Sequence, residues 1–229
     1  MDFEQWLCTN RSGVLWLSGP AECRISDASS RVVDLVKERT SQAQHSVLYF
    51  FCSTASAESS IAITFVGTII YQLACCLPWL KGKIITVFLG TIFRSIRKRE
   101  RLVSRFKPGD PTAVTVEKIL NVSSCEYWSA LRAVMDIVRE QELSFIIDGL
   151  DKIQHKKDQF IRELCTFIEH IWERPPSTRV LLTSRPQAEI KGILGQLPSI
   201  EYDRERKGTI SFFFVLKRNN LAKNCRVSE

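Results

Sequence analysis

Four short apolar segments, separated by longer segments with helical spacing, constrain the fold of this chain more than any other feature. They cover residues 13–19, 45–52, 143–148 and 179–186, and a shorter fifth segment covers residues 199–202. Apolar runs of this length, rich in branched and aromatic residues and closed by turn-forming residues, predict buried strands. Strands that alternate with helices predict a parallel sheet with right-handed crossovers. We therefore expect an α/β fold in which helices flank a parallel sheet.

The segments between these strands show the spacing of packed helices. After the first strand, apolar residues recur at helical intervals, and Ser26 and Asp27 just before them are the expected N-caps. Residues 81–106 are expected to form a helix that becomes increasingly basic and ends at the breaker at residues 108–111. Residues 114–140 predict one or two further helices.

Residues 61–80 contain no charged side chain and form one candidate for a membrane span. About twenty apolar residues are enough to cross a bilayer. The segment nevertheless contains Gln72 and two threonines, has Pro78 near its end, and lies between two predicted strands. We expect a buried core helix, with membrane attachment through residues 61–80 as the alternative.

Composition excludes several other classes of protein. The chain has 229 residues, 45% of them apolar, which is enough to build one large globular domain. Its eight cysteines form no CxxC pair and its three histidines lie far apart, so a zinc site is not expected. The N-terminus has no secretory signal, so we expect a cytoplasmic protein with reduced cysteines.

The positive charge is concentrated in two segments, with +6 in residues 94–107 and +5 in residues 204–229. The rest of the chain is net negative, which gives the total of +7. A basic cluster can contact nucleic acid. A solvated helix end followed by a loop explains residues 94–107 equally simply, and we prefer that interpretation.

Polar side chains follow the third and fourth predicted strands. Asp148 ends the third strand, Asp151 follows three residues later, and Ser184 and Arg185 end the fourth. In parallel α/β sheets ligands bind at the carboxyl ends of the strands. Carboxylates there can hold Mg²⁺ or orient a water, while the hydroxyl and the guanidinium can contact a terminal phosphate. The alternatives are an ordinary aspartate turn and a strand-end salt bridge of Arg185.

This order of motifs resembles the NACHT-type (STAND) signal-transduction NTPases, most closely the fungal NOD-like proteins with a nephrocystin-like N-terminal module. The resemblance covers about residues 1–207, with a helical insert at about 81–141, and leaves residues 208–229 as an unrecognised basic tail. It implies a three-layer, P-loop NTPase-like fold that is incomplete at the C-terminus, and ATP or GTP binding with Mg²⁺. The matching pieces are Phe3, Trp6-Leu7, and residues 12–19, 71–73, 146–151 and 181–186.

The phosphate loop departs from the family pattern G-x-x-x-x-G-K-[ST]. Gly19 and Ser26 match its ends, but Arg24 stands where the second glycine is expected and Ile25 where the lysine is expected. The lysine normally contacts the β- and γ-phosphates. Losing one charge-assisted hydrogen bond costs about 1.5–3 kcal/mol, or roughly 10- to 150-fold in affinity. A side chain at the glycine position costs about 1–2 kcal/mol more if the backbone there is left-handed.

Charged residues near the loop modify this expectation. Glu22 lies inside the loop, and Asp27 places a carboxylate at the helix N-terminus where phosphates would bind. Arg24 can compensate by swinging its charge inward, and Mg²⁺ held by Asp148 and Ser26 can retain some affinity. Lys152 stands where the family often has a further glutamate, which makes hydrolysis doubtful.

These residues predict a degenerate nucleotide-binding module of an intracellular signalling or immunity protein, with weak or no hydrolysis. If catalysis persists, the resemblance implies that Asp151 orients the water, Arg185 senses the terminal phosphate, and Ser26 and Asp148 hold Mg²⁺. The alternative is a non-catalytic interaction domain that associates with itself or with full-length paralogues.

Overall fold

The computed structural model describes residues 6, 13–40, 45–54, 61–103, 123–172 and 178–201. The chain divides into two compact units, one formed by residues 1–57 and 141–229 and the other by residues 58–140. The matching positions Phe3 and Leu7, the breaker at residues 108–111 and the basic tail lie outside the described residues.

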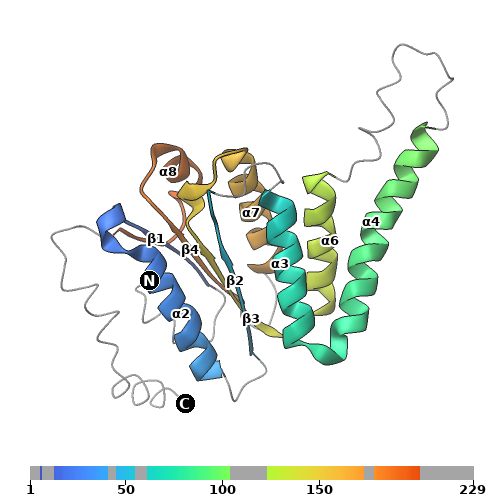
Figure 1. The fold of residues 1–229 in the computed structure, drawn as a ribbon, viewed down its shortest axis with the longest axis horizontal. Helices are drawn as coiled ribbons and strands as arrows, with labels where there is room; N and C mark the ends of the chain where they lie inside the picture. The colour runs from blue at the N-terminus through green and yellow to red at the C-terminus, as the bar shows by residue number, and fades with distance from the viewer. Residues whose placement is uncertain are drawn as a thin grey trace, which may run out of the picture. The chain divides into compact units, whose positions relative to one another are not determined.

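The first unit contains a five-stranded parallel sheet with the order β2-β3-β4-β1-β5 (Figure 1). Each strand coincides with one of the five segments where the sequence predicts it, with β3 and β4 beginning one residue earlier, which confirms the expected α/β fold. The strands are β1 (Gly13–Ser18), β2 (His45–Phe51), β3 (Glu142–Asp148), β4 (Thr178–Ser184) and β5 (Ser199–Glu201).

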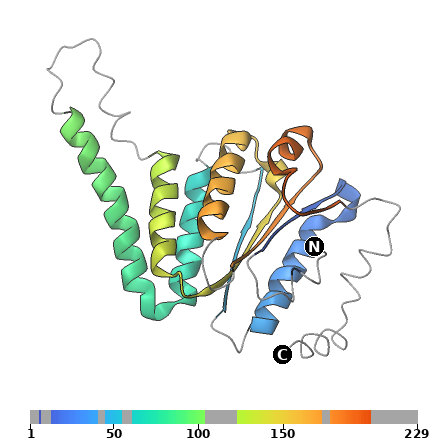
Figure 2. The ribbon, with the colours of Figure 1, turned by 180° about the vertical axis from the view of Figure 1, so that it is seen from behind.

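The strands at the centre of the sheet are buried on both faces. Every residue of β1 and β4, and all of β3 except its first residue, is buried. Continuous apolar runs are typical of parallel strands that are covered by helices on both sides. Helix α2 (Ile25–Thr40) covers one face, and α7 (Lys157–Trp172) and α8 (Ala188–Leu194) cover the other, as Figures 1 and 2 show.

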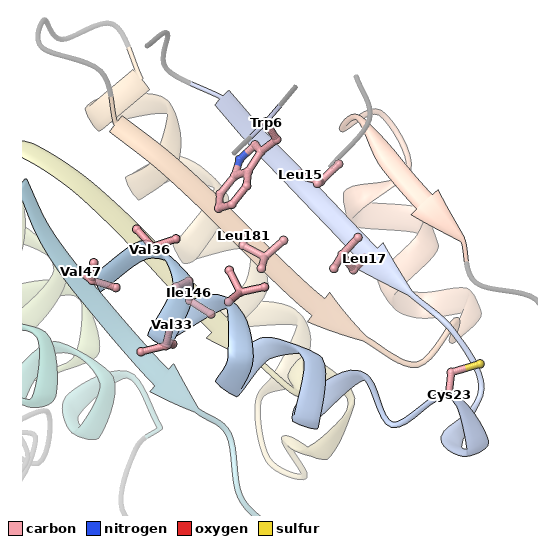
Figure 3. Packing of buried hydrophobic residues seen from close by; sticks show 10 residues of the cluster. Trp6, Leu15, Leu17, Cys23, Val33, Val36, Val47, Ile146 and Leu181 are labelled. Atoms are coloured by element: carbon pink, nitrogen blue, oxygen red, sulfur yellow. The ribbon is translucent and has the colours of Figure 1, made fainter. Parts of the chain in front are cut away.

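A cluster of buried side chains fixes α2 against the sheet (Figure 3). Burying one aliphatic side chain contributes about 1.5–3 kcal/mol, so this cluster holds the N-terminal end of α2 close to the end of β1. The indole of Trp6 closes the cluster and donates a hydrogen bond to the carbonyl of Gly13 at 3.1 Å. The other members are Leu15, Leu17, Cys23, Val32, Val33, Val36, Val47, Ile146 and Leu181.

The start of α2 differs from the sequence-based expectation. The helix begins at Ile25, so Ser26 and Asp27 lie inside its first turn and are not N-caps. The reason is the conformation of Arg24, which is left-handed with φ 49° and ψ 44°. Its carbonyl accepts hydrogen bonds from the amides of Asp27 at 3.0 Å and Ala28 at 3.2 Å. The carboxylate of Asp27 still lies in the first turn, where the helix dipole stabilises a negative charge.

The second unit is helical and contains α3 (Ile61–Cys76), the 3₁₀ turn η2 (Pro78–Leu80), α4 (Lys81–Val103) and α6 (Ser124–Ile137). Phe65 of α3 contacts Trp128 of α6, and Phe88 of α4 contacts Tyr127 of α6. Half of the residues of α3 are buried and form one face of the helix, as expected for a core helix, whereas Tyr71 is exposed. The helix ends before Pro78 because proline cannot continue it.

None of the described helices is both long enough and apolar enough to cross a bilayer on its own. Residues 61–76 and 78–98 together meet the length and composition requirements, but the two helices are bent by 110° at their junction.

At the amino ends of the strands, the ring of His45 is enclosed by three polar side chains. One ring nitrogen lies 3.1 Å from a carboxylate oxygen of Glu142, the other lies 2.8 Å from the hydroxyl of Ser144, and the guanidinium of Arg179 lies 3.4 Å away. The side chain of His45 has no exposed area. Burial lowers the pKa of His45; the hydrogen bond with Glu142 raises it, and the charge of Arg179 lowers it.

This lowered pKa predicts that the protein loses stability in mild acid. Below about pH 6.5 the unfolded chain takes up a proton on this histidine before the folded chain does, so the free energy of unfolding falls as the pH falls toward the folded pKa. Urea denaturation between pH 7.5 and 5.5 should show this loss, and His45→Gln should reduce its slope. His155→Gln, at an exposed position, is the matched control for the loss of a histidine. An unchanged slope in His45→Gln would refute the assignment.

Candidate functional site

A pocket of about 280 Å³ opens at the carboxyl ends of β1, β3 and β4, beside the start of α2. This is the edge of a parallel sheet where ligands bind in α/β proteins. All seven site residues predicted from the sequence line it. Its lining consists of Gly19, Pro20, Ala21, Arg24, Ile25, Ser26, Asp27, Asp148, Gly149, Asp151, Lys152, Thr183, Ser184 and Arg185.

The loop between β1 and α2 folds back through a short 3₁₀ helix, η1 (Ala21–Cys23). Arg24 closes η1 in the left-handed region that favours glycine, so the sequence-based concern about a side chain at this position applies. The guanidinium of Arg24 pairs with the carboxylate of Asp27 at 2.5 Å, and its side chain is 73% exposed. Glu22 is exposed and does not line the pocket, so it does not crowd the site as the sequence suggested.

Asp148 is the most enclosed charged group of the site, with no exposed area. One carboxylate oxygen accepts hydrogen bonds from the hydroxyls of Thr183 at 2.6 Å and Ser29 at 2.9 Å. The turn that follows favours glycine, because Gly149 has φ 77°, in the left-handed region. Neither Ser29 nor Thr183 was predicted from the sequence to be a site residue. Thr183 lies within the fourth strand's motif, whereas no sequence signal singled out Ser29.

Lys152 ends the 3₁₀ turn η3 (Leu150–Lys152), and its side chain folds back over Gly149. Its ammonium donates to the hydroxyl of Ser26 at 3.0 Å and to the second carboxylate oxygen of Asp148 at 3.3 Å. The ammonium therefore lies between the two groups that the sequence suggested as Mg²⁺ ligands.

Asp151 and Arg185 form the third ion pair of the pocket. The backbone amide of Arg185 donates to one carboxylate oxygen of Asp151 at 3.0 Å, and its guanidinium lies 3.4 Å from the other. The side chain of Asp151 is 9% exposed, whereas that of Arg185 is 60% exposed. Both oxygens of Asp151 are thus engaged, and the salt-bridge interpretation of Arg185 describes this arrangement.

The charged side chains that line the pocket balance one another. Arg24, Lys152 and Arg185 are paired with Asp27, Asp148 and Asp151, respectively. Phosphate sites usually carry an excess of positive charge or free helix amides. Here an incoming anion must compete with a carboxylate for each cation.

The arrangement does not fit Mg²⁺. This ion needs near-octahedral oxygen ligands at about 2.0–2.1 Å. One oxygen of Asp148 already accepts two hydroxyl hydrogen bonds, and the other shares the Lys152 ammonium with Ser26. Within the part of the chain that the structure describes, no group of three or more histidine, cysteine or acidic side chains could hold a metal ion.

Cys52 follows β2 and lies next to the site in the structure, since its amide donates to the carbonyl of Asp148 at 2.8 Å. Burial, with a smaller contribution from the charge of Asp148, raises the pKa of the Cys52 thiol to about 12. The thiol is therefore protonated at neutral pH and is not a nucleophile.

The parallel sheet, the loop that leads from β1 into α2, and the acidic end of β3 define an α/β protein with a P-loop-like fold. The chain matches the family described as "Nephrocystin 3, N-terminal" over residues 1–185, and it belongs to this family. No curated protein matches the chain.

Proposed function

We propose that this chain is a degenerate, NACHT-like nucleotide-binding module of an intracellular signalling protein, with weak affinity for ATP or GTP and little or no hydrolysis. The observation that carries the proposal is the pocket at the carboxyl ends of β1, β3 and β4, in a chain of the nephrocystin family. Three cations line this pocket beside the start of a 16-residue helix. Helix N-termini and cationic side chains are the groups that bind phosphate.

The same geometry supports weak affinity. Ile25 supplies no charge at the position where the family motif has its lysine, and Arg24 is held by Asp27. An anion must therefore break ion pairs to reach the cations, which offsets much of what it gains.

Weak or absent hydrolysis follows from the acidic side of the pocket. A general base must accept a proton from the attacking water within hydrogen-bonding distance. Both carboxylate oxygens of Asp151, the candidate base, contact Arg185, and the carboxylate of Asp148 is paired with the ammonium of Lys152. Turnover would require both pairs to open.

Equilibrium titration with fluorescent ATP and GTP analogues tests the proposal. We expect weak, saturable binding, and Arg185→Gln should weaken it by about tenfold because one charge-assisted hydrogen bond is lost. Arg162→Gln, on the exposed face of α7, is the matched control and should bind as the wild type does. A low-micromolar dissociation constant for the wild type would contradict the degenerate loop. No saturable binding at millimolar nucleotide would contradict nucleotide binding itself.

A second function is favoured by the balanced charges of the pocket. Because every cation that lines it has an internal partner, the fold needs no ligand to neutralise the site. A module of this kind can function through protein contacts alone, by associating with itself or with full-length paralogues. Sedimentation velocity with and without nucleotide distinguishes the nucleotide-binding module from the interaction module. Self-association that is unchanged by nucleotide and by Arg185→Gln supports the interaction module.

A further inference from the structure

The charge in the centre of the pocket comes from the protein itself. The Lys152 ammonium lies 3.0 Å from the Ser26 hydroxyl and 3.3 Å from the Asp148 carboxylate. These two groups come from the start of α2 and the end of β3, so the ammonium joins both sides of the pocket. A divalent ion bound by the same two oxygens would have to occupy this position.

The turn after β3 holds the lysine there. Gly149 is left-handed, and its amide donates to the carbonyl and the hydroxyl of Thr183 at 3.0 and 3.1 Å. The amide of Lys152 in turn donates to the carbonyl of Gly149 at 2.9 Å. The lysine stem passes so close over Gly149 that a Cβ there would meet it at 2.9 Å. The stem thus packs over the turn, and the two hydrogen bonds with Ser26 and Asp148 hold the ammonium.

Lys152 retains the capacity to bind a ligand. An ammonium has three N–H donors. Two of them serve Ser26 and Asp148, and the side chain remains 36% exposed in the pocket lining. The third donor can bind an oxygen of an anion that enters the pocket, as a metal ion would.

We infer that Lys152 is a built-in substitute for a divalent cation, so that the site binds phosphate-bearing anions without metal. The choice of a phosphate-bearing ligand rests on the proposed nucleotide binding. The statement that Lys152 takes the place of a metal ion does not depend on that proposal. A metal ion at Asp148 would meet the fixed ammonium at close range, and the two like charges would repel one another. Conversely, magnesium in solution chelates the phosphates and lowers the concentration of the free anion that Lys152 can bind.

Two measurements test the inference. The first is the affinity of the wild type for a fluorescent ATP analogue in EDTA and in excess Mg²⁺. We expect the wild type to bind at least as tightly in EDTA as in Mg²⁺, because magnesium removes the free anion, and Lys152→Gln to weaken binding in EDTA by about tenfold, with recovery in Mg²⁺. Lys98→Gln, exposed on α4, is the matched lysine control. An affinity of the wild type that rises by about tenfold or more with Mg²⁺ would overturn the inference.

The second measurement needs no nucleotide, so it separates this inference from the proposed function. Free Mn²⁺ is measured by electron paramagnetic resonance during titration of the protein. We expect Lys152→Gln to bind Mn²⁺ about tenfold more tightly than the wild type, and the added substitution Asp148→Asn to abolish that gain. Lys152→Arg, which keeps the charge, should resemble the wild type, and Lys152→Met takes the place of Lys152→Gln if that variant does not fold. Mn²⁺ binding that is equally tight in the wild type and in Lys152→Gln would refute the role of Lys152, whether or not nucleotide binds.

Discussion

Asp148→Ala should lower the free energy of unfolding by about 1–3 kcal/mol, because it removes the acceptor of the buried Thr183 hydroxyl and the counter-ion of the half-buried Lys152 ammonium. Asp148 is fully buried and accepts hydrogen bonds from Thr183, Ser29 and Lys152. Without the carboxylate, the two hydroxyls lose an acceptor and the half-buried ammonium loses its counter-ion. Urea denaturation of the wild type and the variant gives the difference directly.

Two controls separate the buried charge from a general effect of removing an aspartate. Asp34→Ala changes an exposed carboxylate of α2 and should alter the free energy of unfolding by less than about 0.5 kcal/mol. Asp148→Ala combined with Lys152→Met should recover part of the loss, because neither charge then remains unpaired. A loss below about 1 kcal/mol for Asp148→Ala would show that the carboxylate does not organise this end of the sheet.

The fold could be predicted because its strands are marked by several independent signals. The segments that became β1, β3 and β4 are continuously apolar and end at turn-forming residues, so their class and approximate bounds followed from the sequence. The start of α2 could not be predicted in this way. Ser26 and Asp27 are the residue types that cap helices best, but the left-handed Arg24 begins the helix one residue before Ser26. The helix starts where it does because Arg24 ends η1 in the left-handed conformation. The preference of Ser and Asp for cap positions does not predict that conformation.

In the site, the positions of the residues could be predicted, whereas the direction of a key side chain could not. That Ser26, Asp148 and Arg185 share one pocket follows from the rule that the ends of parallel strands meet at one edge. The sequence also showed that Lys152 reverses a charge, but not where that charge lies. The direction of this side chain depends on the left-handed turn at Gly149, and the acceptors that fix it come from residues 4 and 126 positions away in the chain.

Restoring the loop motif with Arg24→Gly and Ile25→Lys should tighten the binding of a fluorescent ATP analogue by roughly 10- to 150-fold, the value of one charge-assisted hydrogen bond. The gain is assigned to the lysine. Arg24 is left-handed, so glycine there relieves about 1 kcal/mol of backbone strain. That relief also offsets part of the loss when Ile25, half-buried against the cluster beneath α2, becomes lysine.

The single variants determine which change is responsible. Arg24→Gly alone should raise the midpoint of urea denaturation and leave the dissociation constant within about threefold of the wild type, because glycine adds no group that can bind a phosphate. Ile25→Lys alone should carry most of the gain in affinity, at reduced stability. If Arg24→Gly alone gave the full gain, the loop would be blocked by the arginine side chain and its pair with Asp27, and the lost lysine would not be the cause. If the double variant bound no more tightly than the wild type, the limit would lie on the other side of the pocket. The Asp148–Lys152 pair would then be the group that an incoming phosphate fails to displace.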